Sequence, residues 1–155
     1  MKLALVKSLA VAAVATLPLM ASAQLTANVS LTTNYKFRGQ DQDVIGRDGT
    51  VKDKAFKPAL QGGFDYAHES GFYIGNWNSS VNWLPGNSLE SDIYGGYKFK
   101  AGEIDMDVGL LTYIYPGNSL GNTTEGYVGA TFGPISAKYS HTFSEDYFGW
   151  AGTSL

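Results

Sequence analysis

Hydrophobic and polar residues alternate along most of the chain after residue 24. In residues 25–38 the odd positions are mostly apolar, beginning with Leu25 and ending with Phe37, whereas the even positions are polar. Successive side chains of a β-strand point to opposite faces, so a period of two predicts a strand with one apolar and one polar face. A strand over 25–38 exceeds the length of about five or six residues that is usual in soluble proteins.

The same pattern recurs and predicts seven strands, the other six covering residues 60–67, 73–83, 89–100, 103–114, 125–132 and 135–143. In 73–83 the assignment puts Tyr73, Gly75 and Trp77 on the apolar face and Asn76 and Asn78 on the polar face. The connections alternate between tight turns at 67–71, 101–102 and 133–134 and longer links at 39–57, 84–88 and 116–123. Short turns at one end and long loops at the other are typical of outer-membrane β-barrels.

Alternation does not by itself say which face meets water. In a lipocalin-like barrel the apolar side chains point inward, whereas in a membrane barrel they face lipid and the polar ones line the lumen. Long strands suit a membrane, and aromatic residues near the strand ends suit its two interfaces. The residues assigned to these aromatic girdles are Tyr35, Phe37, Tyr66, Tyr73, Trp83, Phe99, Phe132 and Phe143. We therefore predict an all-β fold, an antiparallel up-and-down transmembrane β-barrel.

The first 23 residues have the pattern of a secretory signal peptide. Lys2 and Lys7 provide a positive start, residues 8–20 are apolar, and residues 21–23 form a small-x-small cleavage site before Gln24. The alternative is a membrane-anchoring helix, but Lys7 leaves the apolar run shorter than the roughly 20 residues that a spanning helix needs. Residues 24–155 are then expected to form the N-terminal part of an outer-membrane β-barrel domain.

Composition excludes several other classes. The chain has 19 Gly, ten Tyr, eight Phe and three Trp, a bias that favours β-structure. Cysteine is absent and there are two His, which excludes disulfides and leaves little for a zinc site. A formal net charge of −3 offers no basic surface for nucleic acid. We expect no cofactor, no metal and no nucleic-acid partner.

Two patterns resemble catalytic or metal sites only in part. Residues 41–46 begin like an EF-hand loop, which would need Asp or Asn at Ile45 and Glu at Lys52. The acidic pairs at 90/92 and 105/107 have the spacing of one strand face, which is ordinary in a barrel lumen. We therefore expect no enzymatic activity.

The first long loop carries a hairpin signal of its own. Asp48 and Gly49 stand between apolar residues, as in a two-residue β-turn. A hairpin here would either lie above the membrane or fold into the lumen, and the sequence leaves both possibilities open.

Charged residues concentrate on the predicted polar faces. The candidate lumen-lining residues are Lys36, Arg38, Asp65, Glu90, Asp92, Lys98, Lys100, Glu103, Asp105, Asp107, Glu125 and Lys138. Acidic residues outnumber basic ones in this set, which predicts a weak preference for cations in a pore. Alternatively, Lys98 and Lys100 pair across strands with Glu90, Asp92 or Glu125 and only stabilise the wall.

Several runs of sequence resemble one known family. Residues 28–39, NVSLTTNYKFRG, resemble the opening strand of the TorF family of porins, also called the Gcw_chp family. Residues 58–75 resemble its next hairpin, and the resemblance continues at 89–98, 122–125, 136–139 and 144–149. It implies a proteobacterial outer-membrane barrel, and the family offers no catalytic residues to carry over.

The chain departs from that family pattern in two places. Residues 41–56 lengthen the first long loop, and the chain stops at Leu155, where similar proteins continue through further strands. The family implies about 12 strands, and bacterial single-chain barrels have even strand numbers. We therefore expect this chain to be an incomplete barrel.

These observations predict an outer-membrane porin, a passive diffusion channel for small hydrophilic solutes with a weak cation preference. Its expected partners are outer-membrane lipid and small hydrophilic solutes or ions. The alternatives are a structural or adhesive outer-membrane barrel with a plugged lumen and, in a third class, a soluble periplasmic lipocalin-like binder. The pattern carries no information on solute identity or subunit association.

Overall fold

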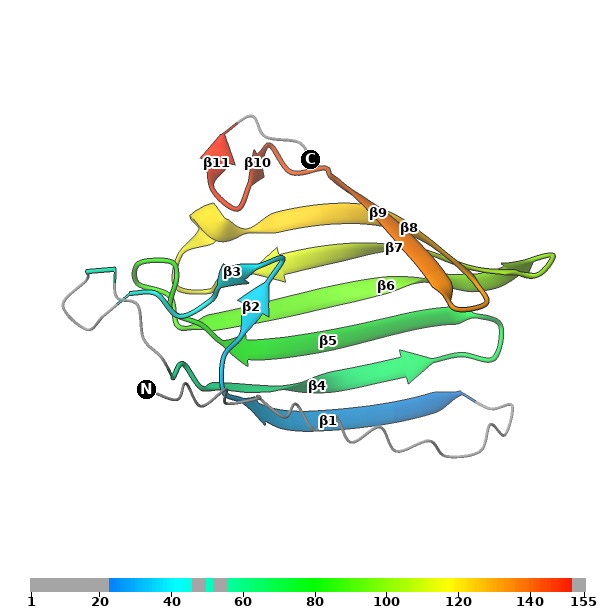
Figure 1. Cartoon of the computed structure of the whole chain (residues 1–155), viewed down its shortest axis with the longest axis horizontal. Helices are drawn as coiled ribbons and strands as arrows, with labels where there is room; N and C mark the ends of the chain where they lie inside the picture. Colours follow the sequence, from blue (N-terminus) through cyan, green and yellow to red (C-terminus); the bar gives the residue numbers. More distant parts are fainter. Residues whose placement is uncertain (1–22, 46–49, 52–55, 152–155) are drawn as a thin grey trace, which may run out of the picture.

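Seven strands form one antiparallel sheet in the order β1–β4–β5–β6–β7–β8–β9 (Figure 1). The computed structural model describes residues 23–45, 50–51 and 56–151, so the predicted signal peptide lies outside the described residues except for Ala23. The strands are β1 (Gln24–Thr32), β4 (Ala59–Ala67), β5 (Phe72–Ser80), β6 (Leu89–Ala101), β7 (Ile104–Ile114), β8 (Thr123–Phe132) and β9 (Ile135–Thr142). The seven predicted strands are confirmed, and within the described residues the sheet is open, with β1 and β9 at its edges.

The connections alternate in length as the sequence predicts. Residues 68–71, 102–103 and 133–134 make the short turns, at the right-hand end of the sheet in Figure 1. Residues 33–58, 81–88 and 115–122 make the long connections at the other end, the last containing the short 3-10 helix η1 (Ser119–Gly121). Within the described ranges, no helix has the length and apolar character needed to cross a membrane.

The first strand is shorter than predicted, and this corrects the expectation of one strand over 25–38. After β1 ends at Thr32, the chain folds into a separate hairpin of β2 (Lys36–Phe37) and β3 (Gln40–Asp41). The turn residues Arg38 and Gly39 have φ values of 46° and 84°. A two-residue hairpin turn with positive φ at both positions reverses the chain sharply, so the alternating pattern continues but the strand does not.

A second hairpin has the same turn. It pairs β10 (Asp146–Tyr147) with β11 (Trp150–Ala151), and its turn residues Phe148 and Gly149 have φ values of 49° and 79°. Phe148 contacts Phe37 of the first hairpin edge-to-face, with ring centroids 5.7 Å apart. The two hairpins therefore meet, although more than a hundred residues separate them in the sequence.

Strand register defines two faces of the sheet. We call one the outer face, on which Val108 of β7 lies between Tyr97 of β6 and Val128 of β8, and the opposite one the inner face. On the inner face, Asp107 lies between Lys98 and Gly129. The predicted faces agree with this register for β1, β4 and β6 to β9.

Strand β5 is the exception, because its predicted faces are inverted. Ile74 lies opposite Tyr66, so it joins the outer face, whereas Tyr73 and Trp77 belong to the inner face. The pattern of β5 is misleading because its outward positions also include Asn76 and Asn78. A tyrosine or tryptophan fits either face, since each has an apolar ring and a polar group.

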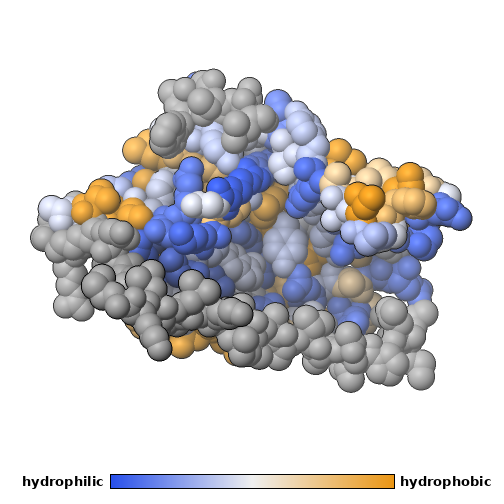
Figure 2. Space-filling view, viewed as in Figure 1, coloured by the Kyte–Doolittle hydropathy of each residue, from blue (hydrophilic) through white to orange (hydrophobic). Residues whose placement is uncertain are grey.

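The described sheet is apolar outside and polar inside. Large apolar side chains of the outer face are exposed, including Val29 at 79 % and Leu110 at 55 %. Among the described residues, the buried polar and charged residues outnumber the buried hydrophobic ones, which are Ala59, Val81, Tyr113 and Tyr115. Figure 2 looks onto the side that carries β2 and β3, where hydrophilic residues surround the hollowed centre and hydrophobic ones lie towards the rim. Large exposed apolar patches are typical of surfaces that contact a membrane, a ligand or another protein.

Three inner-face tyrosines lie against glycines of the neighbouring strand. In each case the tyrosine and the glycine are direct cross-strand partners, and a Cβ atom on the glycine would overlap the aromatic ring. The pairs are Tyr73 with Gly96, Tyr94 with Gly75, and Tyr127 with Gly109. The glycines therefore provide the space in which the rings lie flat against the sheet.

Gly109→Ala is expected to destabilise the folded protein by roughly 1–3 kcal/mol, the usual cost of an overpacked methyl group. The added Cβ would overlap the Tyr127 ring and the backbone carbonyl of Gly95. Gly129→Ala, also on the inner face, is the matched control, because its Cβ would meet nothing closer than 3.7 Å. Urea unfolding of both variants in detergent measures the difference, and equal stabilities would contradict the role assigned to the glycine.

Candidate functional site

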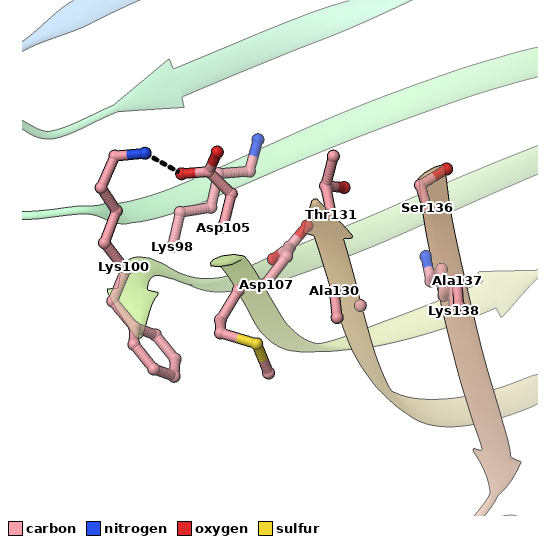
Figure 3. Close-up of a pocket in the computed structure, with 12 residues that line it drawn as sticks. Lys98, Lys100, Asp105, Asp107, Ala130, Thr131, Ser136, Ala137 and Lys138 are labelled. Atoms are coloured by element: carbon pink, nitrogen blue, oxygen red, sulfur yellow. Dashed lines mark hydrogen bonds and ion pairs between the residues drawn. The ribbon is translucent and has the colours of Figure 1, made fainter. Parts of the chain in front are cut away.

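The inner face carries most of the charged side chains that the sequence singled out. Towards the short-turn end, Lys100 pairs with Asp105 across β6 and β7, with Nζ and Oδ1 2.6 Å apart (Figure 3). Lys98 lies over the ring of Tyr73, with Nζ 4.9 Å from the centroid, and Lys138 lies 3.8 Å from the centroid of Tyr127. Lys98 and Lys100 therefore do not form the cross-strand pairs with Glu90, Asp92 or Glu125 that the sequence left open.

Tyrosine hydroxyls, rather than cations, satisfy several inner-face carboxylates. Tyr73 donates to Asp107 at 2.6 Å, and Tyr94 donates to Asp65. Tyr35 and Tyr115 both donate to Glu90, each at 2.7 Å. Tyr35 and Tyr115 lie in connections outside the long strands, and burial together with the charge of Glu90 raises the pKa of both hydroxyls. These donors are neutral hydroxyls, so the hydrogen bonds bring no compensating positive charge to the carboxylates.

Arg38 joins the first hairpin to the wall of the sheet. Its two terminal nitrogens donate to both carboxylate oxygens of Glu125 in β8, at 2.8 and 2.7 Å. The same guanidinium contacts the Tyr147 hydroxyl in the second hairpin at 2.5 Å. Hydrogen bonding to Glu125 raises the pKa of Arg38 above its ordinary value. A bidentate pair of this geometry is the strongest kind of arginine–carboxylate contact, so it holds the hairpin in one place.

A second set of ion pairs supports the hairpin from its other strand. Asp41 in β3 accepts from Lys57 at 2.7 Å and lies 3.4 Å from the Lys36 ammonium. The Lys57 side chain is almost completely buried. The hydrogen bond from Lys57, together with the contact of Lys36, lowers the pKa of Asp41 below its ordinary value. These contacts fix the orientation of the hairpin over the inner face.

Aromatic residues pack between the two hairpins and the sheet at the long-loop end. Val81, Tyr113 and Tyr115 are buried there. The partly buried residues packed around them are Tyr35, Phe37, Trp83, Leu84, Leu111 and Phe148. We call these nine residues the aromatic cluster. Of the predicted girdle residues, Tyr35, Phe37 and Trp83 belong to it and Tyr73 lies on the inner face, so four of the eight girdle assignments are wrong.

Cavities lie along the inner face, from the short-turn half to the aromatic cluster. One of about 590 Å³ is bordered by Lys98, Lys100, Asp105, Asp107 and Lys138 among others (Figure 3). A second of about 650 Å³ is bordered by Arg38, Asp92, Glu125 and Lys138. Lys138 borders both, so polar space continues along the inner face from the short-turn half towards the hairpins.

The structure gathers most of the candidate lumen residues on one face. Asp65, Glu90, Asp92, Lys98, Lys100, Asp105, Asp107, Glu125 and Lys138 lie on inner-face positions of the strands. Lys36 and Arg38 reach that face from the hairpin instead of from the first strand. Glu103 lies in the exposed turn between β6 and β7, which corrects its assignment to the lumen.

The inner-face tyrosines are absent from the predicted site residues. The strand pattern assigns Tyr73 to an aromatic girdle, identifies Tyr94 and Tyr127 only as strand aromatics, and leaves Tyr115 at the start of a loop. A signal for the first three is present, because each lies in a strand pattern rich in glycine. Only the register, however, shows which glycine faces which ring.

The fold and the inner face define an all-β protein with one long meandering antiparallel sheet. A family model described as bacterial protein of unknown function (Gcw_chp) matches residues 19–154. The chain therefore belongs to the Gcw_chp family. Searches of curated proteins and of solved structures found no match.

Proposed function

We propose that the chain forms part of the wall of a transmembrane β-barrel in the bacterial outer membrane. This barrel is a passive diffusion channel for small hydrophilic solutes, with a weak preference for cations. The observation that carries the proposal is the polarity of the sheet, with exposed apolar side chains outside and charged side chains inside. The TorF porin assignment suggested by the sequence is part of the same proposal.

The strand lengths support the membrane part of the proposal. β6 has 13 residues and β7 has 11, and about 9–11 tilted residues cross the hydrocarbon layer. Tyr66, Phe99, Phe132 and Phe143 remain exposed, as residues of an interfacial girdle would be. A soluble lipocalin-like binder would instead turn these apolar side chains inward.

The carboxylates that have no cationic partner support the cation preference. Asp105 is neutralised by Lys100 and Glu125 by Arg38. Asp65 and Asp107 accept from tyrosine hydroxyls, which are neutral and supply no compensating charge. Fixed negative charge in a pore raises the local cation concentration and biases which ions enter.

Planar-bilayer conductance of the protein, extracted from outer membranes with detergent, tests the proposal. We expect channels whose reversal potential in a salt gradient indicates modest cation selectivity. Asp65→Asn/Asp107→Asn should move the reversal potential towards zero, because Asn keeps the hydrogen-bond acceptor and removes the charge. Salt should weaken the effect, since the screening length falls from about 10 Å at 0.1 M to about 3 Å at 1 M.

Glu103→Gln is the matched control, because it removes one carboxylate from an exposed turn outside the inner face. It should leave the reversal potential unchanged. Clear anion selectivity, or a double variant identical to the parent, would contradict the assigned role of the inner face. Recovery of the protein as a soluble periplasmic monomer without detergent would contradict the membrane proposal and favour the lipocalin-like binder.

The aromatic cluster favours a second candidate function, a structural or adhesive barrel with a plugged lumen. Both hairpins lie over the inner face, and Phe37 and Phe148 pack on Tyr113 of the wall with ring centroids 5.5 and 4.9 Å apart. A packed aromatic cluster excludes water from the region it fills. Correctly folded protein that shows no conductance in bilayers would support this second function over the channel.

A further inference from the structure

Among the inner-face carboxylates that the structure describes, Asp92 differs from the others in having no partner. It is 7 % exposed, and its Oδ1 is completely buried. Its side chain makes no hydrogen bond or ion pair with any described residue, whereas Glu90 on the same strand accepts from two tyrosines. Burying an isolated carboxylate is costly unless a cation, a proton or hydrogen-bond donors compensate it.

Asp92 borders the cavity of about 650 Å³ described above. Its cross-strand neighbours are Trp77 on β5 and Tyr113 on β7. Phe37, Tyr113 and Leu111 provide apolar walls to the cavity. A volume of this size is in the range of small-molecule sites, which combine mostly apolar walls with a few polar groups.

The lining indicates the chemistry of a ligand. Glu125, the second carboxylate of this cavity, is already held by the bidentate contact with Arg38, so Asp92 is left as the acceptor for a positive group. Among the described residues there is no group of three or more His, Cys, Asp or Glu side chains able to hold a metal ion. The other cation of the lining, Lys138, lies over the Tyr127 ring. Aromatic walls and one carboxylate without a partner suit an organic ammonium better than a hydrated metal ion, because aromatic faces attract organic cations.

We propose that this cavity binds small alkylammonium solutes, with Asp92 accepting from the ammonium group and Phe37, Leu111 and Tyr113 contacting the alkyl chain. The inference rests on the proposed channel function and gives it a substrate class, because an amine would find a binding point on the pore wall. The site is independent of Asp65 and Asp107, which have their own donors and do not border this cavity.

Binding of butylammonium chloride to the full chain, folded in a non-ionic detergent, tests the inference. The titration is followed by tryptophan fluorescence, since Trp77 is the cross-strand neighbour of Asp92. We expect saturable binding, and Asp92→Asn should weaken it roughly tenfold or more, because the ammonium group loses its contact with a negative charge and keeps only a neutral acceptor. Trp77→Phe should remove most of the fluorescence change, which locates the ligand. Glu103→Gln should bind as the parent does.

Butanol is the uncharged ligand for comparison with butylammonium, and it is tested on the parent protein alone. Parent protein that binds butanol as tightly as butylammonium would overturn the inference, since the cavity would then recognise only the alkyl chain. Equal butylammonium affinity in Asp92→Asn and the parent would also overturn it, and would mean that a proton or a rearranged Lys138 or Arg38 compensates Asp92. Asp92→Asn is expected to fold at least as stably as the parent, because it removes an uncompensated buried charge.

The outcomes separate this inference from the proposed function. If the protein conducts ions but does not bind butylammonium, the channel function is supported and the amine site is contradicted. If the protein binds butylammonium but does not conduct ions, the amine site is supported and the barrel is plugged.

Discussion

Val108→Arg is expected to destabilise the folded protein by about 2–4 kcal/mol in a lipid bilayer. Val108 lies on the outer face of β7, between Tyr97 and Val128. On the proposed function this position is near the middle of the hydrocarbon layer, where a cationic side chain loses its hydration. Urea unfolding in lipid vesicles gives the free energy of unfolding of parent and variant.

Thr131→Arg is the control for this experiment, because it places the same side chain on the inner face. Thr131 is the exposed cross-strand partner of Asp105 and Ser136, so an arginine there stays hydrated and gains a nearby carboxylate. It should change the free energy of unfolding by less than about 0.5 kcal/mol. Equal costs for the two variants would show that the apolar face does not meet lipid.

Arg38→Met is expected to cost roughly 2 kcal/mol, because it leaves Glu125 buried with the Tyr113 hydroxyl, 3.4 Å away, as its one donor within the part of the chain that the structure describes. The cost stays below that of a fully buried pair, since Arg38 is partly exposed and solvent screens its charge. The larger effect is expected on the position of the hairpin. In a conducting barrel, release of β2 and β3 from the wall should increase the single-channel conductance.

A double-mutant cycle isolates the pair from other effects of the substitutions. Glu125→Gln should cost less than Arg38→Met, because it leaves no buried charge behind. The double variant should recover part of the stability that Arg38→Met alone loses. If the two single effects simply add, the contact between Arg38 and Glu125 does not hold the hairpin.

The period-two pattern is sufficient to predict the strands and most of their faces. A residue such as Leu110 or Val128 is clearly apolar, and its neighbours Gly109 and Tyr127 then follow on the other face. The pattern fails at β5, where Asn76 and Asn78 point outward, because local polarity there conflicts with the register that Ile74 shares with Tyr66. Pairing across the whole sheet decides such a conflict, since one strand cannot shift its register without breaking two ladders.

The order of residues along the chain is enough to establish the all-β class, the alternation of short and long connections, the family and the polarity of the two faces. These depend on neighbours in the sequence, or on motifs read in order. Three features are visible only in the folded chain: residues 36–41 leave the wall and fold over it, Arg38 reaches Glu125, and Asp92 has no partner among the described residues. Each of these depends on contacts between residues far apart in sequence, and strand periodicity is the same whether or not such contacts form.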